Sequence, residues 1–250
     1  MPVIYSNTAD GTVYRFGFGA WSGIRGATAG SSVYNATLTN SIMTDMLSTA
    51  FGVNTIFIVT RSFFYFDTSG ITGNVDSVDI EIYGHALSGL TAAGKLIAVK
   101  SNAFGGDGGS ALAIGDFDAM PGWNGSADAT GNVTDYSTVY DISSSSWSLS
   151  GYNSLTGTSD LKTDMKNNNI VIICILNYDY DYKNVIATPI LRQTTGWRTA
   201  NYGGTTSDPR LNYTLATSSG YANTVKGVAT ANIGTVKGVA TANISKVIGV

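Results

Sequence analysis

Few residues of this chain have the types and spacing that catalysis requires. The single histidine, His85, lies in the segment Gly84-His-Ala-Leu-Ser-Gly89 with no cysteine or paired carboxylate nearby in sequence. A serine-type triad or a zinc site needs such partners, so we expect His85 to be a surface residue in a turn. The chain also lacks a Gly-x-Ser-x-Gly elbow, a P-loop and a strand-linked Gly-x-Gly-x-x-Gly motif. We therefore expect no catalytic residue.

Pairs of aspartates are the remaining candidates for catalysis. Asp116 with Asp118, and Asp179 with Asp181, are two residues apart. In a strand such residues point to one face at about 6 to 7 Å from each other. That separation suits the two carboxylates of a glycosidase. Asp-x-Asp at a strand end more often caps a turn or holds a cation, so a small glycosidase or lyase is kept as a second alternative.

Oxygen ligands gather in two glycine-containing segments. The loop Phe104-Gly-Gly-Asp-Gly-Gly-Ser110 and the segment Gly115-Asp-Phe-Asp118 supply backbone carbonyls and the carboxylates of Asp107, Asp116 and Asp118. These are the ligand types that Ca²⁺ prefers. A structural calcium ion is thus the one cofactor that the sequence suggests. The alternative is a glycine-rich loop with solvated aspartates.

Aromatic residues in predicted loops or strand ends offer a surface for sugars. Tyr178, Tyr180 and Tyr182 share one face if their segment is extended. Exposed rings stack on sugar faces, and the aspartates between them can accept hydrogen bonds from hydroxyl groups. The predicted ligand-binding residues are Trp123, Trp147, Tyr178, Tyr180 and Tyr182. The alternative is that these rings cover the open end of the fold or a subunit interface.

The elements that must position these residues are strands. Only 12% of residues are charged, and short apolar segments rich in Val, Ile, Tyr and Phe are bounded by Gly, Asn, Ser or Asp. We predict strands at 12–18, 55–66, 77–83, 95–100, 133–141, 170–177, 195–202 and 210–215. Many short strands without strand–helix alternation predict an all-β fold, an antiparallel β-sandwich of the jelly-roll type.

Two strands and one helix have patterns that predict their burial. Apolar residues alternate with polar ones over 77–83, which predicts one buried face, whereas 170–176 is apolar throughout, which predicts a central strand covered on both sides. The helix 160–166 is expected to begin at the capping residue Ser159 and to turn Leu161 and Met165 inward. The expected core includes Phe64, Phe66, Val78, Ile80, Ile82, Ile172 and Leu176.

The charge and hydropathy patterns exclude two kinds of partner. The formal net charge is −3 and no run of Lys or Arg occurs, whereas nucleic-acid phosphates need a concentrated basic face. No segment approaches the roughly 18 to 20 apolar residues needed to cross a bilayer, so no membrane insertion is expected. The N-terminal residues lack the basic and apolar regions of a signal peptide, so we expect synthesis in a cytoplasm.

The C-terminal segment repeats an eleven-residue unit. Asn232-Ile-Gly-Thr-Val-Lys-Gly-Val-Ala-Thr-Ala242 is followed by Asn243-Ile-Ser-Lys-Val-Ile-Gly-Val250. Glycines and β-branched residues are poor for a coiled coil and favour an extended or β-turn repeat. Such a tail cannot build its own core, so we expect residues 1–216 to form the sandwich and 217–250 to anchor or oligomerise it. The predicted assembly residues are Ile233, Val236, Val239, Ile244, Val247 and Val250.

Four segments together carry a resemblance to a known family. They are Arg61-Ser-Phe-Phe-Tyr-Phe-Asp-Thr-Ser69, Val75-Asp-Ser-Val-Asp-Ile-Glu-Ile-Tyr83, Ile114-Gly-Asp-Phe-Asp118 and Trp197-Arg-Thr-Ala-Asn-Tyr-Gly-Gly-Thr-Thr-Ser-Asp-Pro-Arg-Leu211. Over roughly residues 10–216 the chain resembles a jelly-roll module of phage tail, fibre and other virion proteins, which is related to carbohydrate-binding-module sandwiches. The tail resembles Asn-Ile-x-x-Val-x-Gly-Val-Ala repeats at the ends of phage structural proteins.

The resemblance implies a setting as well as a fold. It implies a non-enzymatic virion structural protein, a bacteriophage decoration, fibre or tail-associated subunit, made in the host cytoplasm. Its partners would be other virion proteins, copies of itself and a cell-surface glycan. A polysaccharide-binding module of an adhesin or secreted enzyme is the alternative. Because one fold serves many functions, the binding activity has to be argued from the site itself.

Overall fold

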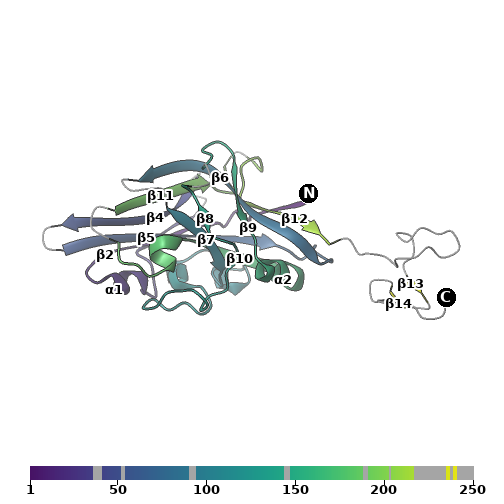
Figure 1. Ribbon diagram of the computed structural model, residues 1–250, viewed down its shortest axis with the longest axis horizontal. Coiled ribbons are helices and arrows are strands. Elements are labelled where there is room, and N and C mark those ends of the chain that lie inside the picture. Colours follow the sequence, from purple (N-terminus) through teal and green to yellow (C-terminus); the bar gives the residue numbers. More distant parts are fainter. Residues whose placement is uncertain are drawn as a thin grey trace. The chain divides into compact units, whose positions relative to one another are not determined.

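The structure is a computed structural model of a chain that divides into two compact units, Met1–Thr214 and Leu215–Val250 (Figure 1). It describes residues 1–35, 41–51, 54–89, 94–143, 147–187, 191–202, 204–216, 235–236 and 239–240. The strands before the tail are β1 (Val3–Tyr5), β2 (Gly11–Phe18), β3 (Ser32–Asn35), β4 (Ser41–Phe51), β5 (Asn54–Asp67), β6 (Val75–Gly89), β7 (Lys95–Lys100), β8 (Tyr140–Asp141), β9 (Tyr152–Thr156), β10 (Ile170–Asn177), β11 (Leu191–Arg198) and β12 (Arg210–Leu215). The helical elements are α1 (Trp21–Arg25), α2 (Ser159–Asn167) and the short turns η1 (Phe104–Gly106), η2 (Ile114–Asp118) and η3 (Tyr178–Tyr182).

Antiparallel pairing joins these twelve strands into one continuous sheet, in which the long strands β5 and β6 each have three partners. The order is β1-β12-β6-β11-β4-β5-β10-β7-β8, with β2 beside β5, β3 beside β2 and β9 beside β6. One edge of β5 pairs first with β4 and then with β10, while β2 occupies its other edge. Similarly, β6 pairs with β9 through residues 79–83 and with β11 through residues 84–89. The prediction of an all-β antiparallel fold is confirmed.

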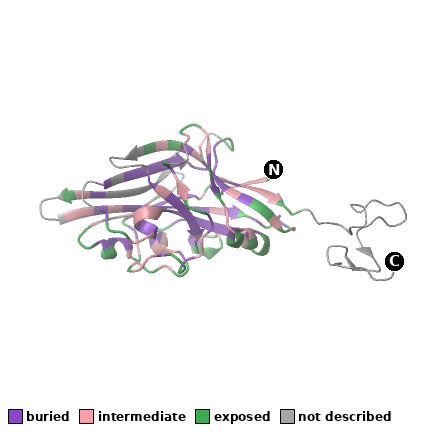
Figure 2. Ribbon diagram, viewed as in Figure 1, coloured by how far each residue is buried: buried purple, intermediate pink, exposed green. Residues whose placement is uncertain are grey.

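Strand β10 is buried on both faces, as its unbroken apolar sequence predicts. Ile172, Cys174 and Leu176 belong to the first core, where α1 and the long segment 103–133 cover the sheet. The alternating residues of the same strand belong to the second core, beneath β6, β9 and α2. Figure 2 shows buried residues concentrated along these central strands. A strand with cover on both sides has no face that favours polar side chains.

The alternating residues of β6 form one wall of the second core. Val78, Ile80 and Ile82 are 3%, 0% and 0% exposed, and they pack with Phe64 and Phe66 of β5. The predicted core residues Phe64, Phe66, Val78, Ile80, Ile82, Ile172 and Leu176 are all buried. The period-2 pattern is therefore confirmed as a guide to burial in this part of the chain.

Helix α2 closes one end of the second core. Leu161 and Met165, four residues apart, are both fully buried, as predicted. The expected cap is wrong by one residue, because the Thr158 side chain, and not Ser159, accepts the N–H of Leu161. The Thr158 hydroxyl also donates to the carbonyl of Asp135 at 2.7 Å, which joins the start of the helix to the neighbouring segment.

Several predicted strand boundaries are wrong. Of the segment 133–141 only β8 forms a strand, together with isolated bridges at Asp135 and Ser137. Strand β11 lies earlier in the chain than the predicted strand 195–202. A turn follows it, closed by a hydrogen bond from the N–H of Tyr202 to the carbonyl of Thr199. Strands β1, β3, β4 and β9 have no counterpart among the predictions. Their sequences mix polar and apolar residues, so pairing with neighbouring strands decides their conformation.

Within the second unit, β13 (Thr235–Val236) and β14 (Val239–Ala240) pair antiparallel, with Val236 opposite Val239. These four residues thus have the extended backbone that the repeat favours. The other predicted assembly residues, Ile233, Ile244, Val247 and Val250, lie outside the described residues. No helix in the described part of the chain is long and apolar enough to cross a membrane.

Candidate functional site

The tyrosine run 178–182 forms a π-helical turn, so it lacks the extended conformation in which its three rings would share one face. Two backbone N–H groups donate to carbonyls five residues earlier, both at 3.1 Å. Tyr178 and Tyr182 stack on each other with ring centroids 5.3 Å apart. Tyr182 is only 1% exposed, and its hydroxyl donates to Asp135 at 2.8 Å. The ring of Tyr182 therefore has no free face for a sugar.

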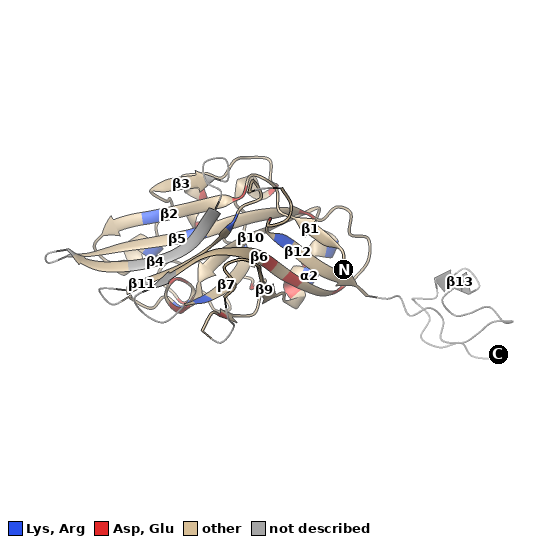
Figure 3. Cartoon of the chain, turned by 90° about the horizontal axis from the view of Figure 1, so that it is seen from above, with Lys and Arg blue, Asp and Glu red and all other residues tan. Residues whose placement is uncertain are grey.

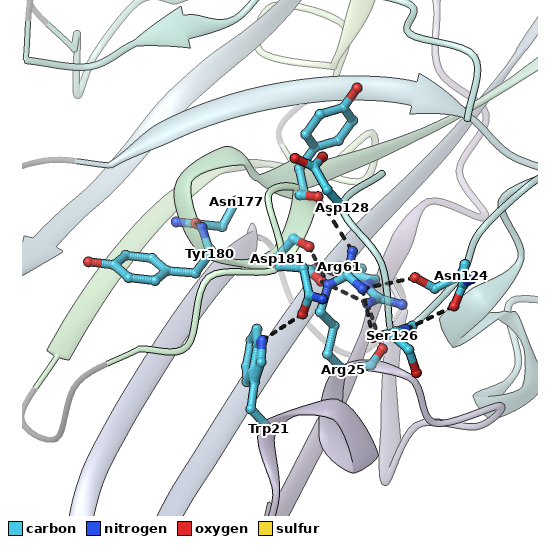
Figure 4. A network of polar contacts seen from close by, with 12 residues as sticks. Trp21, Arg25, Arg61, Asn124, Ser126, Asp128, Asn177, Tyr180 and Asp181 are labelled. Carbon is cyan, nitrogen blue, oxygen red and sulfur yellow. Dashed lines mark hydrogen bonds and ion pairs between the residues drawn. The ribbon is translucent and has the colours of Figure 1, made fainter. Parts of the chain in front are cut away.

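A buried ion-pair cluster holds this turn in place (Figure 4). Arg61 of β5 donates from Nε and Nη2 to the two carboxylate oxygens of Asp181, both at 2.8 Å. Arg25 of α1 donates from Nε to the Asp181 carbonyl and lies 3.6 Å from Asp181 Oδ1. The paired donors of a planar guanidinium match the two oxygens of a carboxylate. The cluster thereby ties β5, α1 and η3 together.

Trp123 completes this cluster. The guanidinium carbons of Arg25 and Arg61 lie 4.1 and 4.2 Å from the centre of its ring. The guanidinium of Arg61 also lies 4.0 Å from the ring of Phe117. Cations are attracted to aromatic faces, most strongly where water is excluded. The ring of Trp123 is thus occupied by two buried cations, which supports a structural role over a sugar platform.

The cluster holds two guanidinium groups against the one carboxylate of Asp181. Burial lowers the pKa of Arg25 to about 10, although the attraction of Asp181 opposes this shift. Backbone carbonyls take up the remaining donors, at 2.8 Å for Arg25 to Gly125 and 2.6 Å for Arg61 to Phe117. Buried charge is tolerated only when it is paired and hydrogen-bonded. The two arginines therefore fix the segment that covers the first core.

The aspartates predicted to bind calcium are not gathered at one point. Among the described residues no group of three or more His, Cys, Asp or Glu side chains could hold a metal ion. Asp107 and Asp116 each accept a backbone N–H within their own turn, at 2.8 and 2.9 Å. Asp118 is the last residue of η2. Burial raises the pKa of its carboxyl group, and the positive charge of Arg61 partly opposes this shift. The calcium prediction gains no support from this arrangement.

Neither Asp-x-Asp pair lies in a strand. Asp116 and Asp118 belong to η2, and Asp179 and Asp181 belong to η3. The carboxylate of Asp181 is held by Arg61, and Asp179 Oδ2 accepts the N–H of Lys95 at 3.2 Å. The extended geometry that would place two carboxylates on one face is therefore absent at both pairs.

His85 and Trp147 lie apart from the ion-pair cluster. Strand β6 continues to Gly89, so the turn predicted around His85 is wrong, although the residue is exposed. Partial burial and the positive charge of Arg198 lower the pKa of His85. Trp147 packs against the second core, whereas Trp123 packs against the first. Because these cores lie on opposite faces of β10, the five predicted aromatic residues do not form one surface.

An apolar surface that was not predicted lies on the sheet formed by β2, β3 and β5. Tyr14, Phe16 and Phe18 alternate along β2, and the pairing places Phe16 opposite Ile58 and Phe18 opposite Ile56. The ring of Tyr34 from β3 stacks on Tyr14 at 5.4 Å. We call this surface the aromatic strip; its members are Tyr14, Phe16, Phe18, Tyr34, Ile56 and Ile58.

The aromatic strip is unusually open to solvent. Phe16, Phe18 and Tyr34 are 42%, 52% and 46% exposed. The same face of β5 carries Phe64 and Phe66, which are fully buried in the second core. The second core therefore covers this face of β5 near Phe64 and Phe66 but not near the aromatic strip. Figure 3 shows that most of the ribbon of β2 and β5 is neither basic nor acidic.

The opposite face of these strands is also partly apolar. A cavity of about 610 Å³ is lined there by Trp21 and Phe57 and bordered by Ile186, which is 64% exposed. The indole nitrogen of Trp21 donates to Asn184 at 3.0 Å. Contiguous exposed apolar groups on a folded protein usually mark a surface that meets a partner. The alternation of Tyr14, Phe16 and Phe18 was the sequence signal for this surface.

No protein-family model matches the chain, and no curated protein matches it.

Proposed function

We propose that this chain is a non-enzymatic virion structural protein, a decoration, fibre or tail-associated subunit of a bacteriophage, with a jelly-roll body. The observation that carries the proposal is the aromatic strip. A structural subunit needs a surface that stays uncovered until copies assemble, and exposed aromatic rings without charge are typical of such surfaces. The resemblance of several chain segments to phage virion modules supplies the setting.

The proposed partner of the aromatic strip is the repeat tail of a second copy of the chain. The tail offers Ile233, Val236, Val239, Ile244, Val247 and Val250 but few large side chains with which to form its own core. Val236 and Val239 already have an extended, paired backbone, which suits contact with a flat sheet face. Burial of six such side chains contributes about 9 kcal/mol, at about 1.5 kcal/mol each, before ordering costs.

Light scattering on the purified chain tests this assembly. The full chain should form oligomers, whereas a chain ending at residue 216 should be a folded monomer with unchanged circular dichroism in the strand region. Phe16→Asp in the full chain should also be monomeric, because a charge on the aromatic strip opposes its burial. The matched control is Leu149→Asp, at an exposed leucine outside the aromatic strip (54% exposed), which should still assemble.

Each variant tests a different part of the proposal. Normal assembly of the chain ending at residue 216 would show that the tail is not the partner. If that chain assembles while Phe16→Asp does not, two aromatic strips meet face to face instead. The virion setting is tested separately by peptide mass spectrometry of purified particles of a phage whose genome encodes this chain. Particles without its peptides would refute a virion role.

A further inference from the structure

A polar groove lies where β7 ends and β10 begins. Its volume is about 600 Å³, within the range of about 300 to 1,000 Å³ that small-ligand sites occupy. The lining comes from five separate parts of the chain: the end of β7, the η1 turn, the segments around Pro121 and Tyr136, and the stretch from the end of α2 into β10. Only the folded chain brings these parts together.

Side-chain amides dominate the rim of the groove. Asn102, Asn167 and Asn169 line it and are exposed, and their amide groups make no hydrogen bond to another described residue. Each amide offers an acceptor oxygen and two donor hydrogens. Asp107 adds a carboxylate whose Oδ1 is fixed by the N–H of Gly109 at 2.8 Å. The groove therefore presents hydrogen-bond donors and acceptors that no other described residue occupies.

The groove has no unpaired positive charge among the described residues. Its one cation, Lys100, donates from Nζ to Asp164 Oδ2 at 2.8 Å. The same carboxylate accepts the hydroxyl of Tyr136, another lining residue. Because the lysine charge is already paired, the groove has no free cation for a phosphate or sulfate group. Its chemistry suits an uncharged ligand with many hydroxyl groups.

The wall formed by η1 has an unusual backbone. Phe104 has a φ of 57°, and Gly105, Gly106 and Gly108 have φ values of 77°, 83° and 73°. A bulky residue with positive φ is held there by the rest of the structure. Phe104 is fully buried in the first core, which fixes this wall in one conformation. A rigid wall lowers the ordering cost of binding.

Apolar atoms supply the remaining surface that a sugar ring needs. Ile170 and Pro121 line the groove, and neither is buried. Sugar rings combine hydroxyl groups at their edges with C–H groups on their faces, so they contact amides and apolar atoms at the same time. The lining of Asn102, Asp107, Asn167, Asn169, Pro121 and Ile170 provides both kinds of contact.

We infer that this groove binds a neutral saccharide of one or two sugar units. The inference names a ligand site distinct from the aromatic residues predicted for sugar binding, and it does not depend on the assembly role of the aromatic strip. The amides would exchange hydrogen bonds with the sugar hydroxyl groups, and the carboxylate of Asp107 would accept hydrogen bonds from two of them. No covalent bond is made or broken.

The test is binding of neutral sugars to the full chain. Saturation-transfer NMR with glucose, galactose, mannose, N-acetylglucosamine and their common disaccharides should identify at least one ligand, and calorimetric titration should then measure its affinity. Asn102→Ala and Asn169→Ala should each weaken binding by about 3- to 10-fold. Asp107→Asn should also weaken it. The melting temperature of each variant should stay unchanged, because these side chains are exposed.

Asn132→Ala is the matched control, since Asn132 is also exposed but lies outside the groove and donates to the carbonyl of Asp128. It should bind sugar like the unchanged chain. Loss of binding in Tyr180→Ala but not in Asn102→Ala would overturn the inference in favour of the aromatic residues. Absence of binding to every neutral sugar tested would overturn it as well. So would binding only to glucose 6-phosphate with an affinity that rises at low salt, because that result requires an anion site.

Discussion

Replacement of Asp10 by asparagine should stabilise the protein at pH 8 and have little effect at pH 4. Asp10 is fully buried between β1 and β2. Its Oδ2 accepts the N–H of Ala200 at 3.0 Å and the hydroxyl of Ser6 at 3.5 Å, whereas Oδ1 has no hydrogen-bond partner among the described residues. A buried carboxylate with one unpartnered oxygen favours its protonated form.

The magnitude follows from the pKa of Asp10. Burial is the largest cause and the charge of Asp208 adds to it, so the pKa rises from 3.8 to about 7 despite the hydrogen bond from Ala200. Below pH 3.8 the group is protonated in both the folded and unfolded states, and no penalty exists. As the pH rises towards 7, only the unfolded state releases the proton, so the free energy of unfolding falls. The full loss is about 4 kcal/mol, at about 1.4 kcal/mol for each of roughly three pH units.

Asparagine keeps an acceptor for the N–H of Ala200 but carries no charge. The measurement is urea unfolding, followed by tryptophan fluorescence, of the unchanged chain and Asp10→Asn between pH 4 and pH 8. The difference in the free energy of unfolding should grow with pH towards about 4 kcal/mol in favour of the variant. Asp76→Asn, at an exposed aspartate, should show no such growth. A difference for Asp10→Asn that stays constant across this pH range would refute the reasoning.

Two further substitutions test the two cores. Arg61→Met should lower the free energy of unfolding by about 3 to 5 kcal/mol in urea unfolding, because it leaves the buried carboxylate of Asp181 without its bidentate partner; a loss below 1 kcal/mol would contradict a structural role for the ion-pair cluster. Phe64→Ala should cost about 3 to 5 kcal/mol in the same assay, since the ring is fully buried against Trp197 in the second core. Unchanged stability would contradict its place in that core.

Local patterns in the sequence determine the strands that form the centre of the protein. The unbroken apolar run of β10 predicts burial on both faces, and the alternation in β6 predicts one buried face; both are observed. The helix 160–166 is also predicted, except for its cap. These predictions succeed because side-chain direction repeats every two residues in a strand and about every 3.6 in a helix, so the pattern alone states which face is buried.

Tertiary contacts decide the conformation of the segment 178–182. By local pattern alone, the alternating tyrosines and aspartates fit an extended strand as well as they fit a turn. Asp181, however, pairs with Arg61, 120 residues earlier in the chain, and in the folded chain this buried ion pair is made from a π-helical turn. Propensity differences of a fraction of a kcal/mol cannot outweigh the cost of an unpaired buried charge.

The candidate surfaces also depend on distant parts of the chain. The sequence shows part of the aromatic strip as the alternation of Tyr14, Phe16 and Phe18. Only the pairing with β5 shows that these residues lie beyond the part of that face which the second core covers. The polar groove has no local signal, because its lining residues come from five separate parts of the chain. The sequence by itself determines which residues prefer to be buried; the tertiary structure decides which exposed residues meet, because contacts between distant segments depend on the path of the whole chain.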